Sequence, residues 1–545
     1  MMVSLAIRSF NFLLIANFIA TRGIPKKTTT KATPEKSTTT ATPKNPTTTA
    51  TSSIDINVVK PIIPTTDRIK KLMSSPMSIG YFRDIIKALN QNMYIPHLNV
   101  DFDRSSTRIL PKDRERFAQG LINNTTLKIL MINIDIDDTI AYGLRNNTSI
   151  RSLTINTYNI KTNDDIIPKN TERLKINLHN ANIYTPQLIS HIAHNPTIVY
   201  LIINCGVQNY LYTDDIHHIL DIFSINRSIK HLDLRLQDIK LSNLSIQKIM
   251  QSGIKELSIL YGTTDQLIPT MVYLINNLSS NKNIIKLHIG THGLMYNSSV
   301  AIGDQELAQS FEHLFITNHT LESLTITNNN FTNIIGYGIT NGMKKNNSIH
   351  YLNLSDNKFS EEIYIQFANL IKYNKMLHTM VLYDSLLGKD NVNIKHQYPY
   401  NPEITLNMVE EAFANALIGN KNLVRLEMDA KRFSSGVIFN ALQYNHTLEG
   451  LSLLHNNFKN NAIDDIINMI VHNYTLKRLI LSYGRQHEED INRVASAIKD
   501  NTSILDFDMG FDGMGRAFAS PYLKRNKEQQ RIIDESMISK LLTNL

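Results

Sequence analysis

The stretch Asn346–Phe359 reads "NNSIHYLNLSDNKF", and nearly the same pattern returns as "NHTLEGLSLLHNNF" over Asn445–Phe458. In each copy an Asn stands three residues before an apolar residue, and two Leu residues follow that are themselves two apart. In the first copy these are Leu352 and Leu354, which point to one face of a short strand, whereas Tyr351 points to the other face. We therefore predict strands that bury one face and leave the other open.

The frame N-x-x-[LI]-x-x-L-x-[LI] recurs along most of the chain. Fourteen steps separate its first clear position, Ile95, from its last, Ile504, so the mean step is about 29 residues. With one degenerate copy at Leu174 and Ile176, the frame occurs fifteen times. The other first apolar positions are Leu127, Ile150, Ile198, Ile229, Ile254, Ile284, Leu321, Ile349, Leu377, Leu423, Leu448 and Leu476.

Helical spacing follows each predicted strand. In "EEIYIQFANLIKYN", Ile363, Phe367, Leu370 and Ile371 form an i, i+4, i+7, i+8 stripe, which favours an amphipathic helix packed on the strand layer. The Asn at the end of each helix suits a left-handed turn. These residues are Asn374, Asn445, Asn473 and Asn501. A second Asn, after the strand, can bond the backbone of neighbouring coils; examples are Asn329, Asn357 and Asn456.

Strand–turn–helix units of 28 or 29 residues with the pattern L-x-x-L-x-L-x-x-N-x-[LF] resemble leucine-rich repeats of the ribonuclease-inhibitor type. The resemblance covers roughly residues 90–510, and its motif is full at Leu321, Ile349 and Leu448. It implies an α/β fold: a right-handed leucine-rich-repeat solenoid, or horseshoe, with parallel strands on the concave side and helices on the convex side. It also implies that the chain binds other proteins.

Five segments follow from this interpretation. Residues 1–20 combine Arg8 with a largely apolar run, Phe10–Ala20, which is typical of a secretory signal peptide; an uncleaved membrane anchor is the alternative. Residues 21–55 are a Thr/Pro/Lys-rich linker with too few apolar side chains to fold. Residues 56–94 form an N-terminal helical cap, 95–510 the repeat domain, and 511–545 a C-terminal helical cap.

The net charge of +8 argues against a nucleic-acid ligand once it is located along the chain. Residues 1–60 hold eight basic and two acidic side chains, a net charge of +6, which leaves about +2 for the other 485 residues. A body of nearly balanced charge lacks the basic surface that phosphate binding needs. The single cysteine, Cys205, allows no intramolecular disulfide, so the 42% of hydrophobic residues must hold the fold.

No group of residues predicts catalysis, a cofactor or a metal, so the chain is expected not to be an enzyme. The glycines of "GYGITNG" (Gly336, Gly338, Gly342) have the wrong spacing for a dinucleotide loop and lie where a repeat helix belongs. Two acidic clusters lack a full calcium-ligand series. They are Asp135, Asp137 and Asp138, and Asp506, Asp508 and Asp512. "RQHEED" has His487 and Glu488 without the second His of a zinc-protease motif.

Several N-x-[ST] sequons occur because the repeat places Asn at a helix end and Ser or Thr in the following turn. They include Asn124, Asn147, Asn226, Asn318, Asn445 and Asn473. We interpret them as products of the repeat pattern, with glycosylation as the alternative.

The candidate binding site combines open strand positions with an insertion. The open positions in the C-terminal half are Ser323, Thr325, Tyr351, Asn353, Thr379, Tyr383, Arg425, Glu427, Asp429 and Arg478. The step from Leu377 to Leu423 is 46 residues, and its surplus carries Tyr398 and Tyr400. A second surplus lies between Ile284 and Leu321. Aromatic and Arg side chains dominate protein-binding hot spots, so the predicted contacts are Tyr351, Tyr383, Tyr398, Tyr400, Arg425 and Glu427.

The sequence therefore predicts a non-enzymatic, protein-binding scaffold, secreted or displayed at the cell surface, with a host protein as a candidate partner. The expected ligand is a protein or peptide, with no nucleic acid and no membrane insertion of the folded body. The alternative is a structural surface-coat or adhesion component, in which the linker matters and the concave face does not.

Overall fold

The computed structural model describes residues 78–102, 109–156, 160–178, 186–205, 218–236, 241–262, 267–291, 303–329, 331–357, 359–383, 405–429, 433, 435–454, 458, 460–482, 487–510 and 513–543. All of these residues lie in one compact unit, Pro64–Leu545.

Fifteen strands form a single open sheet in which every strand pairs in parallel with its neighbours in chain order. The strands are β1 (His97–Asp101), β2 (Ile129–Asn133), β3 (Ser152–Ile155), β4 (Arg173–Leu178), β5 (Tyr200–Cys205), β6 (His231–Leu236), β7 (Glu256–Tyr261), β8 (Lys286–Thr291), β9 (Ser323–Thr327), β10 (Tyr351–Asn353), β11 (Thr379–Leu382), β12 (Arg425–Asp429), β13 (Gly450–Leu454), β14 (Arg478–Ser482) and β15 (Asp506–Gly510). Each copy of the sequence frame thus corresponds to one strand.

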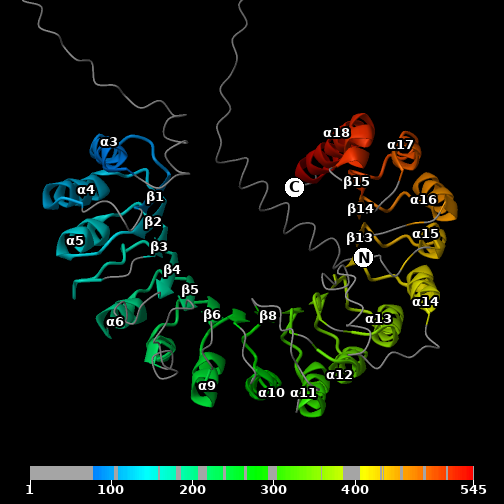
Figure 1. Cartoon of the computed structure of the whole chain (residues 1–545), viewed down its shortest axis with the longest axis horizontal. Coiled ribbons are helices and arrows are strands. Elements are labelled where there is room, and N and C mark those ends of the chain that lie inside the picture. The colour runs from blue at the N-terminus through cyan, green and yellow to red at the C-terminus, as the bar shows by residue number, and fades with distance from the viewer. Residues whose placement is uncertain are drawn as a thin grey trace, which may run out of the picture. The chain divides into compact units, whose positions relative to one another are not determined.

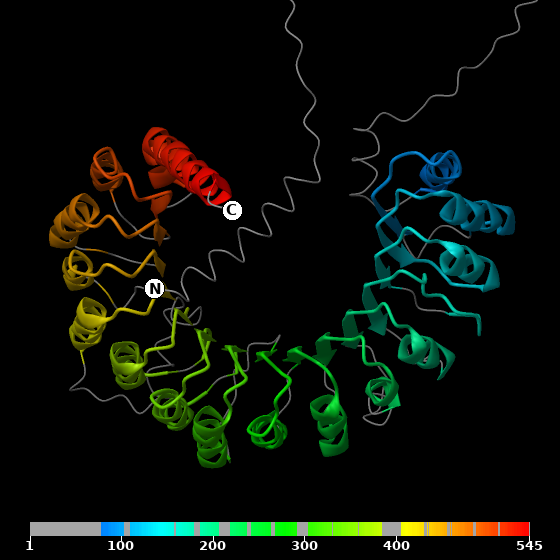
Figure 2. The ribbon, with the colours of Figure 1, turned by 180° about the vertical axis from the view of Figure 1, so that it is seen from behind.

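Helices alternate with the strands, and within this unit they form the outer layer while the strands line the inner, concave side (Figures 1 and 2). The helices are α3 (Ile79–Asn90), α4 (Pro111–Asn123), α5 (Asp138–Asn146), α6 (Pro186–His194), α8 (Ile222–Ile225), α9 (Asn243–Gln251), α10 (Leu267–Leu278), α11 (Asp304–Thr317), α12 (Asn333–Met343), α13 (Glu361–Tyr373), α14 (Leu406–Gly419), α15 (Val437–Leu442), α16 (Asn460–His472), α17 (Glu488–Ala497) and α18 (Met514–Thr543). Helices α3 and α18 lie at the two ends of the repeat array (Figure 1).

The strand phase confirms the alternation that the sequence predicts. Leu352 on β10 is fully buried and stands in register with Leu324 on β9 and Met380 on β11. Tyr351, one residue earlier, is only half-buried on the open face. The apolar stripe of α13, including Phe367, is also buried. Leucine layers from successive strands and stripes from successive helices therefore form one continuous core.

The backbone at the helix ends differs from the prediction. Asn374 has extended angles (φ −76°, ψ 129°), so the expected left-handed turn is wrong. Hydrogen bonds of the Asn374 side chain close the turn instead. Its Oδ1 accepts hydrogen bonds from the backbone N–H groups of Met376 and Leu377, both at 2.8 Å. Its Nδ2 donates to the carbonyls of Met343 and Asn346 in the preceding repeat, at 2.7 and 3.2 Å. A side chain that closes the turn leaves the backbone free to enter the strand directly.

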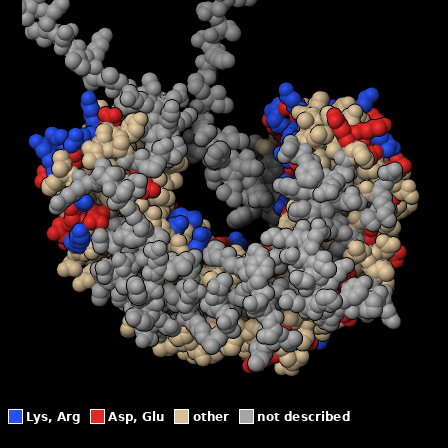
Figure 3. Space-filling view, in the orientation of Figure 1, with Lys and Arg blue, Asp and Glu red and all other residues tan. Residues whose placement is uncertain are grey.

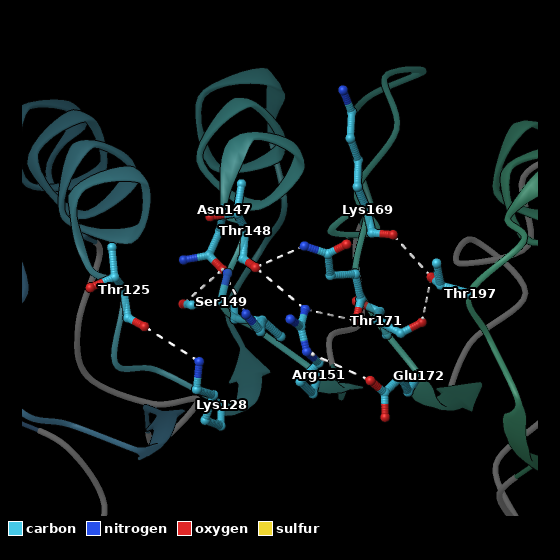
Figure 4. A network of polar contacts seen from close by, with 12 residues as sticks. Thr125, Lys128, Asn147, Thr148, Ser149, Arg151, Lys169, Thr171, Glu172 and Thr197 are labelled. Atoms are coloured by element: carbon cyan, nitrogen blue, oxygen red, sulfur yellow. Dashed lines mark hydrogen bonds and ion pairs between the residues drawn. The ribbon is translucent and has the colours of Figure 1, made fainter.

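The same pair of acceptor bonds recurs at the equivalent Asn of twelve repeats, which we call the rim asparagines. They are Asn124, Asn147, Asn195, Asn226, Asn281, Asn318, Asn346, Asn374, Asn420, Asn445, Asn473 and Asn501. Figure 4 shows this rim around Asn147, where Arg151 also reaches the carbonyls of Thr148 and Asn170.

The six sequon asparagines named above belong to the rim set, and each is at most 5% exposed. Their Nδ2 atoms, to which a glycan would be attached, donate hydrogen bonds to carbonyls of the preceding repeat, as at Asn473. A glycan at these positions is incompatible with the folded repeats.

The Asn after the strand also joins neighbouring coils. Asn357 is buried, donates to the carbonyl of Ile326 in the preceding repeat at 2.8 Å, and accepts from the backbone N–H of Asn329 at 3.2 Å. Asn456 lies outside the described residues.

The glycines of the "GYGITNG" stretch lie in α12, where Gly338 and Gly342 permit close packing on α11 and Gly336 packs against Phe359 and Ile363. A Cβ added to Gly338 would lie 2.3 Å from the carbonyl oxygen of Ala308, and one added to Gly342 would lie 2.9 Å from Glu312 Cα. These glycines are therefore needed for helix packing, which explains them without a nucleotide loop.

The C-terminal helix α18 closes the far end of the core through its first half. Ala519, Leu523 and Asn526 are buried there, and Asn526 donates to the carbonyls of Asn501 and Ile504. Among the helices that the structure describes, none combines the length and the apolar character needed to cross a membrane.

Candidate functional site

The inner face of the sheet presents one open side chain per strand just before the buried Leu. Because adjacent strands lie about 4.8 Å apart, these side chains come into contact across the sheet. We call this set row one. From β4 to β15 it consists of Arg173, Tyr200, His231, Glu256, Lys286, Ser323, Tyr351, Thr379, Arg425, Gly450, Arg478 and Asp506.

The first five members of row one form an unbroken chain of contacts, which we call the polar chain. The Arg173 guanidinium lies 5.5 Å from the centre of the Tyr200 ring. That ring stacks on His231 with centroids 3.8 Å apart and planes 9° from parallel. His231 Nδ1 lies 2.8 Å from Glu256 Oε2, and Lys286 Nζ lies 2.6 Å from Glu256 Oε1. Five consecutive repeats thus place one mixed aromatic and charged surface on the concave side.

Electrostatics within this surface favour the ionised form of Glu256. Burial alone raises the pKa of this carboxyl, but the hydrogen bonds and positive charges of Lys286 and His231 outweigh that effect, so the pKa lies below its ordinary value. Asp233, in the next open position of β6, is paired with Arg235, whose Nη2 lies 3.1 Å from Asp233 Oδ2.

A shallow groove of about 320 Å³ runs over the polar chain from β4 to β9. Ser258, His288, Ser323 and Thr325 extend its lining beyond the charged residues. Figure 3 shows Lys and Arg side chains gathered on this inner side, with acidic side chains nearby. The groove can accept hydrogen-bonding, aromatic and charged groups of a ligand.

The structure brings three of the predicted site residues together on the C-terminal half of the sheet. Tyr383 Oη lies 2.9 Å from Glu427 Oε2 and 3.1 Å from Ser452 Oγ. Arg425 Nε lies 3.8 Å from Glu427 Oε1. Burial is the largest effect on the pKa of Tyr383 and raises it above its ordinary value; the hydrogen bond to Ser452 lowers the pKa, the Glu427 carboxylate raises it, and Arg478 lowers it. Tyr383 therefore connects three neighbouring strands instead of projecting freely.

The other predicted residues are placed differently. Tyr351 lies in row one between Ser323 and Thr379, and no hydrogen bond or ring contact within the described residues joins it to the Tyr383 cluster. Tyr398 and Tyr400 lie outside the described residues. Asp429, which the strand pattern places on the open face, is buried.

Three residues of the acidic clusters noted in the sequence, Asp135, Asp137 and Asp506, have structural partners. Asp137 accepts a hydrogen bond from the backbone N–H of Ile140 and thereby caps α5, and Asp135 pairs with Lys161. Within the described residues, no cluster of three or more His, Cys, Asp or Glu side chains is arranged to hold a metal ion. Cys205 is buried, and that burial raises the pKa of its thiol to about 12, which makes it a poor nucleophile at neutral pH.

The polar chain was missed from the sequence although its signal is present there. The frame places an open residue directly before the second Leu or Ile of each copy, and in the N-terminal half this position is held by Arg173, Tyr200, His231, Glu256 and Lys286. Reading that position across consecutive copies, as for the C-terminal half, would have predicted the row.

One open sheet of fifteen parallel strands alternating with helices is the architecture of a leucine-rich-repeat protein of the ribonuclease-inhibitor type. No family model and no curated protein matches the sequence. Among solved structures, the leucine-rich repeat-containing protein LegL7 from Legionella pneumophila is 13% identical, with a TM-score of 0.34 over 62% of this chain and 93% of that chain. Actin-binding site 2 of leiomodin-1 is 14% identical, with a TM-score of 0.23 over 45% of this chain and 99% of that one. Both TM-scores are too low to carry an argument about function.

Proposed function

We propose that the chain is a non-enzymatic scaffold that binds a segment of another protein in the groove over β4–β9. The observation that carries this proposal is the polar chain, in which Arg, Tyr and His side chains from consecutive strands form one continuous surface. Arg and Tyr are enriched in protein-binding hot spots, and mixed polar surfaces are typical of protein interfaces.

The length of the polar chain suits a short extended segment. Four strand spacings separate β4 from β8, a span of roughly 19 Å at about 4.8 Å per spacing. An extended chain covers this distance with about six residues.

A protein ligand fits this surface better than a nucleic acid does. A phosphate backbone crossing the groove would meet the carboxylates of Glu256 and Asp233, which are already paired with Lys286, His231 and Arg235. Binding of a single-stranded oligonucleotide as tightly as a selected peptide, with the steep salt dependence of phosphate contacts, would contradict this choice.

The proposal is tested by blocking the groove. Peptides of about 12 residues, twice the span of the polar chain, would be selected from a random display library on the full chain. Their affinities would then be measured for wild type and for Ser258→Tyr, which places a bulky neutral side chain on the groove floor. We expect affinity to fall about tenfold or more, which corresponds to about 1.4 kcal/mol.

The matched control is Ser280→Tyr, at an exposed position after α10. It should bind like wild type. If Ser258→Tyr and Ser280→Tyr both keep the wild-type affinity, the groove is not the binding site.

The predicted C-terminal site remains a second proposed contact. Tyr383, Arg425 and Glu427 lie together on the sheet, and the insertion with Tyr398 and Tyr400 follows β11 in the sequence. Deleting residues 389–402 should weaken partner binding and leave the fold intact, because these residues are surplus to the repeat frame between Leu377 and Leu423. Unchanged affinity of the deletion variant would remove this site.

Secretion or surface display is also proposed, and its support is the sequence of the first 20 residues. Fusing residues 1–60 to a reporter that is active only after export would test it, with Arg8→Glu as the control. A surface-coat or adhesion role, the alternative, would instead predict that the Ser258→Tyr variant retains full function at the surface.

A further inference from the structure

Within the described residues, the two carboxylates of the groove are paired with cations, and Lys or Arg side chains without a carboxylate partner lie only at the β4 end. Glu256 is paired with Lys286 and lies against His231, and Asp233 is paired with Arg235. On β4, by contrast, Arg173, which lines the groove, and Lys175, which lies beside it, occupy successive open positions. Within the described part of the chain, no carboxylate lies within ion-pair distance of either side chain.

The polar groups beside this cation pair are already engaged with one another. In the third open row, Asn177 Nδ2 donates to Asn156 Oδ1 at 2.9 Å, and Asn204 Nδ2 donates to Asn177 Oδ1 at 3.2 Å. The carboxylate of Asp101, on β1, accepts from Asn133 at 2.5 Å. Side-chain amides thus occupy the row beyond Lys175, and no described carboxylate pairs with either cation.

Two apolar side chains lie on the same open face two strands away. Ile129 on β2 is 41% exposed, and Met131 is half-buried beside it. Register places Ile129 in row one, so this apolar patch stands about 10 Å from Arg173 at about 4.8 Å per strand.

We infer that the segment bound in the groove carries an acidic residue that pairs with Arg173 and Lys175, and an apolar residue three positions away that lies over Ile129. The inference rests on the proposed function. Open residues two apart on a strand are roughly 7 Å apart, so one carboxylate between the two flexible side chains can accept hydrogen bonds from both. Such charge-assisted bonds are stronger than neutral ones. Three residues of extended chain span the distance to β2.

Library selection with a charge reversal tests this inference. Peptides selected on the full wild-type chain should be enriched in Asp or Glu, with an apolar residue three positions from it. The variant Arg173→Glu/Lys175→Glu should lose this enrichment and bind the wild-type peptides at least about tenfold more weakly. For wild type, affinity should also fall when salt rises from about 0.05 M to about 0.5 M.

The matched control is Lys344→Glu/Lys345→Glu, which makes the same change in net charge at exposed positions after α12. It should select the same acidic peptides as wild type.

Selected peptides that are blocked by Ser258→Tyr but show no acidic enrichment would overturn this inference alone. An acidic enrichment that persists in peptides selected on the variant Arg173→Glu/Lys175→Glu would also overturn this inference alone. Peptides that are insensitive to Ser258→Tyr would instead overturn the proposed function. The salt dependence of wild type keeps the test decisive if the reversal variant fails to fold.

Discussion

The rim asparagines and row one are both repeated once per coil, yet they behave in opposite ways. At the rim, the same residue makes the same bonds in twelve repeats, as Asn374 and Asn473 do. In row one the residue changes from strand to strand, from Arg173 to Tyr200 to His231. The rim asparagines are buried, and their hydrogen bonds fix the turn. The row-one side chains are open, so substitutions there change the stability of the fold little. The comparison indicates that the constant positions determine the solenoid, and the proposed function assigns binding to the variable positions.

The largest stability effect is expected at a constant core position. Leu352→Ala should lower the free energy of unfolding by about 2–5 kcal/mol, because Leu352 is fully buried and the truncation leaves a cavity. Tyr351→Ala, at the adjacent row-one position, should cost much less. A urea titration checks both variants, and equal losses would break the distinction between constant and variable positions.

The second-largest loss of stability is expected at a rim asparagine. Asn473→Ala would leave the part-buried backbone N–H of Thr475 and the buried backbone N–H of Leu476 without their acceptor, at a cost of about 1–3 kcal/mol. The control Asn468→Ala, at an exposed position of α16, should be nearly neutral because Ala favours helix. If urea midpoints fall equally for both, the side-chain bonds of the rim do not stabilise the turn.

Much of the fold follows from the sequence because it depends on periodicity. A period of two places Leu352 inside and Tyr351 outside, and the helical stripe through Phe367 follows in the same way. The backbone of Asn374 was predicted wrongly because either a left-handed turn or a side-chain bond can end a helix at Asn, and the residue type does not distinguish them. The polar chain depends on contacts between side chains of neighbouring strands. Unequal numbers of residues separate these strands in the sequence, so the contacts could be recognised only once the register of the sheet was known.

A smaller loss is expected at Tyr383. Tyr383→Phe removes the hydroxyl that lies near Glu427 and Ser452, which should cost about 1 kcal/mol of stability. Tyr444→Phe, at a side chain that is 68% exposed, serves as the control and should be neutral. Neutral behaviour of both variants in thermal unfolding would show that the Tyr383 cluster is not pre-formed in solution.

The smallest expected effect depends on pH. His378 stacks on His350 with centroids 5.1 Å apart, and burial together with His350 lowers the pKa of His378 from its ordinary 6.5. Below pH 6.5 the unfolded chain therefore takes up a proton before the folded chain does, so stability should fall as the pH drops and stay unchanged above that value.

This dependence is checked by comparing the urea midpoints of wild type and His378→Gln at about pH 7.5 and about pH 5.5. The variant should lose less stability than wild type on acidification. An equal or larger loss in His378→Gln would contradict the assignment to His378.

The most direct test of the division between constant and variable positions replaces the whole polar chain, Arg173, Tyr200, His231, Glu256 and Lys286, by Ser. The affinity of this five-residue variant for the library-selected peptides is the measurement. We expect the affinity to fall about a hundredfold or more, since single hot-spot truncations cost about 2 kcal/mol, while the urea midpoint confirms an intact solenoid. Wild-type affinity in a folded five-residue variant would contradict the claim that the variable open positions determine binding.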